Sequence, residues 1–171
     1  MHDLAVTAIG HDRPGIVAAV TRVLHERGGN LEDSAMTILG GHFAIVLLVA
    51  TEDDPELLHA ALSAATVELG LTISVSRADS STRAAEPTHL LSVYGADRPG
   101  IVAEVTAALA GAGANVIDLE TQVIGAAEDP VYAMVVELAS DAPEEVASAV
   151  AAACAALGVD HTLRTIDTET Y

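Results

Sequence analysis

Two stretches of this chain have nearly the same sequence. Residues 7–36 align with residues 92–121 without a gap, and 14 of the 30 aligned positions are identical. The strongest match is Gly10–Ala18, which returns as Gly95–Ala103 and shares the run Asp-Arg-Pro-Gly-Ile-Val-Ala. A repeat of this length indicates a duplicated structural unit, so the two halves of the chain should have the same fold.

Apolar periodicity in the first half predicts four strands and two helices. Short apolar runs have the length of strands, and apolar residues at helical spacing form one face of each helix. The pair Gly40-Gly41 suits a two-residue hairpin turn, which needs positive φ. In chain order the predicted elements are strand Leu4–Ile9, a helix with the apolar face Ile16, Val20, Val23 and Leu24 that Gly28-Gly29 ends, strands Leu31–Leu39 and Phe43–Ala50, a helix between Pro55 and Gly70, and strand Leu71–Ser76.

The second half follows the same plan with a longer hairpin loop. Residues 125–130 replace the tight glycine turn, as expected of an insertion at an exposed loop. The predicted elements are strand Leu90–Tyr94, helix Pro99–Ala112, strands Val116–Ile124 and Val131–Leu138, helix Pro143–Leu157 and strand Val159–Ile166.

The order βαββαβ in each half predicts an α+β protein made of two ferredoxin-like units. Each unit would have four antiparallel strands with two helices on one face. The polar residues 79–87 show no periodicity and are typical of a linker. We therefore expect a first domain over residues 1–79, a linker over 80–88 and a second domain over 89–171.

Composition limits the function. The net charge is −18, with seven Lys and Arg residues in total, none of which is lysine. Phosphate backbones are bound mainly through basic side chains, so this balance argues against direct contact with nucleic acid. The single cysteine rules out an internal disulfide, and no apolar run reaches the roughly 18 residues of a membrane span. We expect a soluble cytoplasmic protein without a membrane segment.

The sequence contains no catalytic or metal-binding pattern. Its histidines are scattered, and none lies at metal-ligand spacing from Cys154 or another histidine. Asp53-Asp54 and Glu144-Glu145 are paired carboxylates, but the positive end of a helix explains both pairs. We expect no enzyme activity, no metal and no cofactor.

The repeated Asp-Arg-Pro-Gly loop is the main candidate for a binding site. It precedes a predicted helix, and the free N–H groups of a helix N-terminus can receive a carboxylate. Gly15 and Gly100 would let a ligand approach the backbone, while Asp12 and Asp97 would suit an ammonium group. Together these features match an amino-acid zwitterion. The alternative is structural: the aspartate caps the helix and the proline lies in its first turn.

Asn30 and Asn115 are the second candidates. Each lies 18 residues after the loop aspartate, at a helix-to-strand turn. An asparagine amide can donate and accept hydrogen bonds to a ligand. The alternative is an asparagine that only tolerates left-handed geometry in a turn.

These motifs resemble two ACT domains. The pattern Asp-Arg-Pro-Gly-Ile-Val followed by Gly-Gly-Asn-Leu or Gly-Ala-Asn-Val is similar to that family, and a freestanding pair is similar to the glycine cleavage system transcriptional repressor family. The resemblance implies an amino-acid effector bound between modules, a regulatory protein or an enzyme as partner, and a homodimer. The binding residues it implies are Asp12, Arg13, Gly15, Ile16, Asn30 and Leu31 in the first copy and Asp97, Arg98, Gly100, Ile101, Asn115 and Val116 in the second.

Two other functions compete with an amino-acid-responsive regulator of transcription in glycine or amino-acid metabolism. One is a regulatory subunit of a biosynthetic enzyme, such as the small subunit of acetolactate synthase, but that family joins one ACT domain to a different second domain. The other is an enzyme, which the lack of a nucleophile–base pair argues against.

Overall fold

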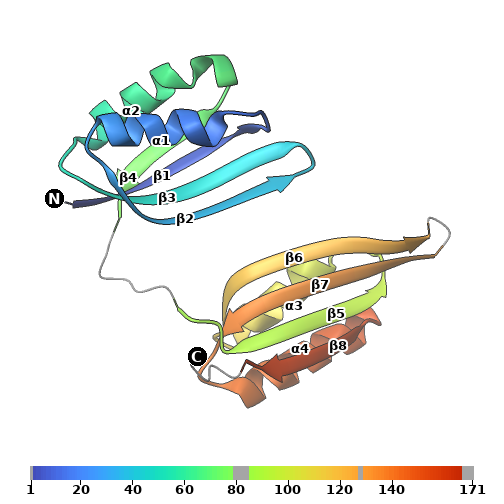
Figure 1. Ribbon diagram of the computed structural model, residues 1–171. Helices are drawn as coiled ribbons and strands as arrows, with labels where there is room; N and C mark the ends of the chain where they lie inside the picture. Colours follow the sequence, from blue (N-terminus) through green and yellow to red (C-terminus); the bar gives the residue numbers. More distant parts are fainter. Residues whose placement is uncertain (1, 79–84, 127–128, 167–171) are drawn as a thin grey trace. The chain divides into compact units, whose positions relative to one another are not determined.

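The computed structural model describes residues 2–78, 85–126 and 129–166. The chain divides into two compact units, Met1–Arg83 and Ala84–Tyr171, called here the first and second modules (Figure 1). Most of the expected linker and the tip of the longer hairpin loop, residues 79–84 and 127–128, lie outside the described residues.

Each module has the predicted βαββαβ order, with its helices on one face of an antiparallel sheet (Figure 1). A short 3-10 helix, η1, follows the second helix of the first module. The elements are β1 His2–His11, α1 Ile16–Glu26, β2 Asn30–Leu39, β3 His42–Thr51, α2 Pro55–Ala65, η1 Val67–Leu69 and β4 Thr72–Arg77, then β5 His89–Ala96, α3 Ile101–Gly111, β6 Asn115–Ala126, β7 Asp129–Ala139, α4 Pro143–Leu157 and β8 Asp160–Thr165.

The two sheets have the same topology. Their strand orders are β2-β3-β1-β4 and β6-β7-β5-β8, and every neighbouring pair is antiparallel. Gly40 and Gly41 form the β2–β3 turn with φ of 57° and 79°, as predicted from their freedom to adopt positive φ. The duplicated ferredoxin-like fold is therefore confirmed.

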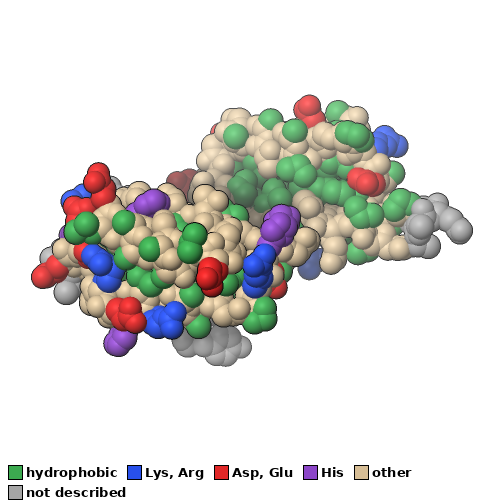
Figure 2. All heavy atoms as spheres, turned by 90° about the horizontal axis from the view of Figure 1, so that it is seen from above, with side chains coloured by type: hydrophobic (Ala, Val, Ile, Leu, Met, Phe, Trp, Pro, Cys, Tyr) green, Lys and Arg blue, Asp and Glu red, His purple; other side chains and the backbone are tan. Residues whose placement is uncertain are grey.

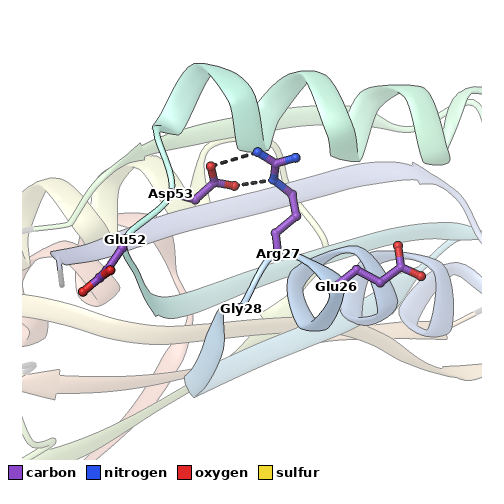
Figure 3. A pocket seen from close by; sticks show the side chains of 5 residues that line it. All are labelled: Glu26, Arg27, Gly28, Glu52 and Asp53. Atoms are coloured by element: carbon purple, nitrogen blue, oxygen red, sulfur yellow. Dashed lines mark hydrogen bonds and ion pairs between the residues drawn. The ribbon is translucent and has the colours of Figure 1, made fainter.

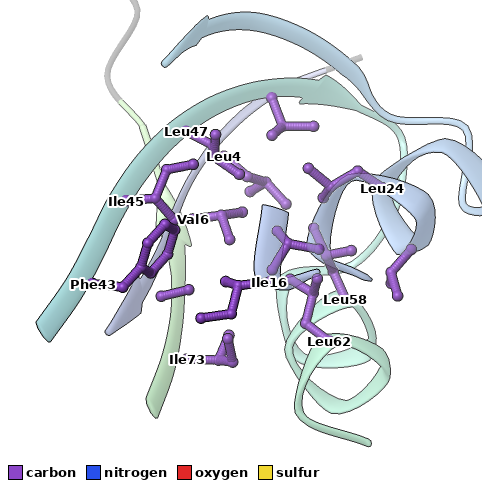
Figure 4. Close-up of a cluster of buried hydrophobic side chains, with 14 residues drawn as sticks. Leu4, Val6, Ile16, Leu24, Phe43, Ile45, Leu47, Leu58, Leu62 and Ile73 are labelled. Carbon is purple, nitrogen blue, oxygen red and sulfur yellow. The ribbon is translucent and has the colours of Figure 1, made fainter. Parts of the chain in front are cut away.

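Each module has its own hydrophobic core between the sheet and the two helices. In the first module, alternate residues of β1 and β3 point toward α1 and α2, as Figure 4 shows for Leu4, Val6, Phe43 and Ile45. In the second module the corresponding strands and helices bury a separate set, which includes Leu109 and Met134. The two clusters have no residue in common, so each module can bury its apolar residues by itself.

The continuous apolar run in β3 places apolar side chains on both faces of the first sheet. Phe43, Ile45 and Leu47 face the helices, whereas Val46 and Leu48 lie on the other face with 48% and 37% of their surface exposed. The strand is central in the sheet, and the helices of the module cover only one of its faces.

Charged side chains of both signs are dispersed over the face shown in Figure 2. On the face of each module seen in Figure 2, arginines are separated by acidic and apolar residues and do not gather into a basic patch. Within the described residues, no helix is long and apolar enough to cross a membrane.

Candidate functional site

The β1–α1 loop ends on a glycine that the backbone geometry requires. Gly15 precedes α1 with φ of 95°, and Gly100 precedes α3 with φ of 99°; neither helix has a side-chain cap. A Cβ built on either glycine would meet no atom within 4 Å. The left-handed backbone therefore explains these glycines, and the space beside them is open to a ligand.

The alternative role proposed for Asp12, capping the helix, is wrong. Helix α1 begins only at Ile16, so Asp12 lies outside the position from which a side chain can cap it, and Pro14 lies before the first turn. The Asp12 N–H instead donates to the Gly41 carbonyl at 2.9 Å, which ties the loop to the β2–β3 turn. The exposed Asp12 carboxylate takes no part in the helix terminus.

Arg13 and Arg98 connect the loop that precedes the first helix of each module to the helical segment that precedes its last strand, which is η1 in the first module and α4 in the second. The Arg13 guanidinium donates to the Glu68 carbonyl, and the Arg98 guanidinium to the Leu157 carbonyl, both at 3.4 Å. At the Leu157 carbonyl a cation is also favourable because the dipole of α4 is negative at that end. Both arginines were predicted to contact a ligand, and the structure gives each a partner within its own module that sequence patterns did not reveal.

Ile16 and Ile101 are core residues. Each side chain has only 1% of its surface exposed and packs between sheet and helices. Their side chains are therefore not available to a ligand, and these two predicted binding residues can contact one only through their backbone N–H groups at the helix N-termini.

Asn30 and Asn115 begin β2 and β6, and no described non-glycine residue has positive φ. The alternative explanation of a left-handed asparagine is therefore wrong; Gly28 and Gly113, each with φ of 72°, make the turn. Both asparagine residues are exposed.

Asp12 and Asn30 lie at opposite ends of the first sheet. Asn30 pairs with Ala50, whose partner on β1 is Asp3, whereas Asp12 follows His11 at the other end of that strand. His11 lies eight positions after Asp3 along β1, about 26 Å at roughly 3.3 Å per residue. One module therefore cannot place both side chains on a small ligand. The second module repeats this arrangement.

A β-bulge follows the start of the second strand in both modules. The register shifts between Leu31 and Asp33 in the first module and between Val116 and Asp118 in the second. Leu31 is exposed, whereas Val116 is half-buried against the core. A bulge redirects the side chains beside it. Asp33 and Asp118 are identical in the repeat, which is the one sign of this feature in the sequence.

Arg27 and Asp53 form an ion pair that sequence analysis did not identify. It lies at the end of the first module opposite the β1–α1 loop. Arg27, at the end of α1, donates two hydrogen bonds to the carboxylate of Asp53 before α2, one of them at 2.8 Å. The pair lies beside a pocket of about 560 Å³ that Glu26, Gly28 and Glu52 also line (Figure 3). The Arg27 equivalent in the repeat is Ala112, so the second module cannot form this pair.

We expect the first module to lose stability in acid as Asp53 is protonated. The hydrogen bond from Arg27 holds the pKa of Asp53 below its usual value, with further help from the charge of Arg27, against an opposing effect of burial. Because the folded pKa is lower than the unfolded value of about 3.9, the carboxylate stabilises the fold above that pH and this contribution is lost as pH falls through the folded pKa. Urea midpoints measured from about pH 6 down to pH 2 check this.

Two variants separate Asp53 from the other acids. In Asp53→Asn, the urea midpoint of the first module should fall less between about pH 6 and pH 2 than it does in the parent. In Asp141→Asn, at the equivalent position of the second module, the midpoint of the first module should fall as much as in the parent. A fall in Asp53→Asn equal to that of the parent would contradict the prediction.

The second module has a pocket of about 250 Å³ at the N-terminus of α3. It is lined by Arg98, Gly100, Ile101, Val102, Ala103 and Tyr132. Three of these were predicted binding residues; Tyr132, which comes from β7, was not. Among the described residues, no group of three His, Cys, Asp or Glu side chains could hold a metal ion. Cys154 is buried in the core, as expected, and burial raises the pKa of its thiol.

Comparison with known proteins agrees with this architecture. The ACT domain profile matches residues 2–76 and again 88–164. Over 144 residues, 83% of this chain and 76% of the relative, the sequence is 28% identical to the glycine cleavage system transcriptional repressor of Escherichia coli K12. It is 44% identical over 77 residues to a UPF0237 protein of Methanopyrus kandleri, which covers 43% of this chain and 86% of that relative.

A solved structure is similar over nearly the whole chain. The crystal structure of an unknown protein from Galdieria sulphuraria has a TM-score of 0.83 at 35% identity, and the match covers 96% of this chain and 98% of that one. The profile matches account for most of the residues of both modules. The chain therefore belongs to the ACT-domain family and carries two ACT domains in tandem.

Proposed function

We propose that this protein is a cytoplasmic, non-enzymatic regulator that responds to a small amino acid. Each ligand would lie between the β1–α1 loop of one module and the start of the second strand of a neighbouring module. The separation of Asp12 from Asn30 within one module carries this proposal, because residues at opposite ends of a sheet can flank one small ligand only when two modules come together. A homodimer or a pairing of modules within the chain would provide that contact.

The loop supplies the chemistry for a zwitterion. The uncapped N-terminus of α1 offers N–H groups and a partial positive charge to the ligand carboxylate. The exposed carboxylate of Asp12 is available to the ammonium group. Arg13 positions the loop through the Glu68 carbonyl and so acts at a distance from the ligand.

The signal would pass to a protein partner. The net charge of −18 disfavours direct binding to nucleic acid, and the relative in Escherichia coli is named a transcriptional repressor of the glycine cleavage system. Control of amino-acid metabolism through another regulatory protein fits both observations. The ligand would act by binding one arrangement of modules better than another, which shifts their populations.

A thermal-shift screen of the twenty amino acids tests the proposal. An amino acid that binds the native state should raise the melting temperature in a concentration-dependent way, since binding stabilises the folded protein by mass action. No shift with any of them would overturn the proposed function.

Asp12→Ser should weaken binding of the amino acid that gives the largest shift by about tenfold or more, because a charge-assisted hydrogen bond is worth roughly 1.5–3 kcal/mol. Since Asp12 makes no cap, the free energy of unfolding should change little. Calorimetric titration and urea melts measure the two effects. Asp97→Ser provides the matched test in the second module. Unchanged affinity in both variants would remove the aspartates from the site.

A further inference from the structure

His11 and His42 lie side by side on the first sheet. They are the last residue pair between β1 and β3, and their ring centroids are 4.8 Å apart with 31° between the ring planes. Just beyond this pair the Asp12 N–H donates to the Gly41 carbonyl. The two histidines are therefore a non-hydrogen-bonded pair, the kind in which opposite side chains come closest. Sequence spacing did not reveal the pair, because its members are 31 positions apart.

The two histidines point away from the helices of their module. Ala8 and Phe43 are buried in the core, so alternation along the strands places His11 and His42 on the opposite face of the sheet. Both histidines are exposed, and within the described residues neither ring has a hydrogen-bond partner. Their ring nitrogens are accessible to an ion from solvent. The proposed amino-acid site lies instead at the N-terminus of α1, on the side of the sheet that carries the helices.

The second module shows that the fold does not require this pair. The equivalent residues are Ala96 and Val131, the last residue pair between β5 and β7. Small or apolar side chains therefore suffice at this position of the sheet. Like charges directly opposite one another destabilise a sheet, so two residues that can both be protonated are a poor choice for packing alone.

The geometry and the charge of this region suit a metal cation. Imidazole nitrogens are ligands for Zn²⁺, Ni²⁺ and Cu²⁺. Two nitrogens bound to one Zn²⁺ at about 2.0–2.1 Å in tetrahedral geometry are roughly 3.3 Å apart. Rings with centroids 4.8 Å apart can reach that spacing, because both are exposed and the terminal torsion of histidine is soft. The net charge of −18 and the exposed Asp12 beside His11 favour a cation here.

We propose that His11 and His42 form a site of the first module for a divalent transition-metal ion such as Zn²⁺. Each histidine supplies one unprotonated ring nitrogen to the ion. No group of three His, Cys, Asp or Glu side chains among the described residues could hold a metal, so water fills the remaining coordination positions. The second module, with Ala96 and Val131, has no such site. This inference goes beyond the proposed amino-acid response and does not depend on it.

Calorimetric titration with Zn²⁺ at neutral pH tests the site on the full chain, without a histidine tag and after metal removal by a chelator. The parent should bind one ion per chain. His11→Ala and His42→Ala should each weaken binding at least tenfold, because only one imidazole of the pair remains. Since both histidines are exposed, the melting temperatures without Zn²⁺ should stay close to that of the parent. His25→Ala, which removes an exposed histidine of α1, is the matched control and should bind like the parent.

Transfer of the pair to the second module is the reciprocal test. Ala96→His combined with Val131→His builds the same cross-strand pair there, and this variant should bind two Zn²⁺ ions per chain. In the parent, the ring signals of His11 and His42 in NMR spectra should shift together during the titration.

Three results would count against the site. No saturable binding by the parent, or unchanged affinity in both single alanine variants, would overturn it. A transferred pair that adds no second ion would overturn the argument that the cross-strand geometry makes the site.

Discussion

Leu109→Ala should destabilise the second module by about 2–5 kcal/mol, the usual cost of removing a buried leucine side chain. Leu109 lies on α3 with 0% of its surface exposed, among the core residues of that module. The loss combines the transfer free energy of the removed atoms with the cost of the cavity that remains. Because the cores of the modules have no residue in common, the first module should keep its stability.

Hydrogen exchange resolved by module measures this result. Amides of the second module should exchange faster in Leu109→Ala, and those of the first should be unchanged. Leu24→Ala, at the equivalent position of α1, is the mirror-image variant and should reverse the pattern. Equal loss of protection in both modules would mean that they unfold as one cooperative unit.

Gly95→Ala should cost about 3 kcal/mol, the upper end of the range for overpacking a core. A Cβ at Gly95 would lie 2.6 Å from Val159 Cγ1, 3.0 Å from its Cβ and 3.3 Å from its Cα. Valine is short and stiff at χ1, so it cannot swing its side chain away. The strand β5 would have to move relative to the start of β8. Urea denaturation of the variant gives the change in unfolding free energy.

Two further variants locate the strain. Gly10→Ala, the same change in the first module, should cost less because its closest contact, at 2.7 Å, is Cδ2 of Leu71, the far end of a longer side chain. In a double-mutant cycle, Val159→Ala should recover part of the loss in Gly95→Ala. Additive losses would show that the predicted contact with Val159 does not cause the destabilisation.

Much of the fold could be predicted from local patterns. The apolar stripe Ile16, Val20, Val23 and Leu24 is buried as expected, and Gly40-Gly41 makes the expected turn. These features depend on residues a few positions apart, whose geometry the chain itself dictates. The assignment of Asp12 as a helix cap was wrong because the loop continues for three residues beyond it. Gly15, in the left-handed conformation, is instead the N-cap residue from which α1 begins.

The candidate site could be predicted only in part. The repeat identified the loop and the asparagines as candidates, but their spacing of 18 residues does not reveal the distance between Asp12 and Asn30. That distance arises because α1 returns the chain to the end of the sheet at which β1 begins. The hydrogen-bond partners of Arg13 and Arg98 could not be predicted either, because they are backbone carbonyls, which every residue has. Tyr132 passed unnoticed because one hydroxyl in an apolar strand changes no periodicity.

By itself the sequence determined that this protein has two copies of a βαββαβ unit, the order of the strands and helices in each copy, and which loop is repeated. Those properties follow from periodicity and turn residues, which act over short distances along the chain. Only the tertiary structure decided that Arg27 binds Asp53, that Arg13 and Arg98 donate to backbone carbonyls, and that Tyr132 lies near the N-terminus of α3. These contacts join residues far apart in sequence, and they exist only once the strands have paired and the helices have packed on the sheet.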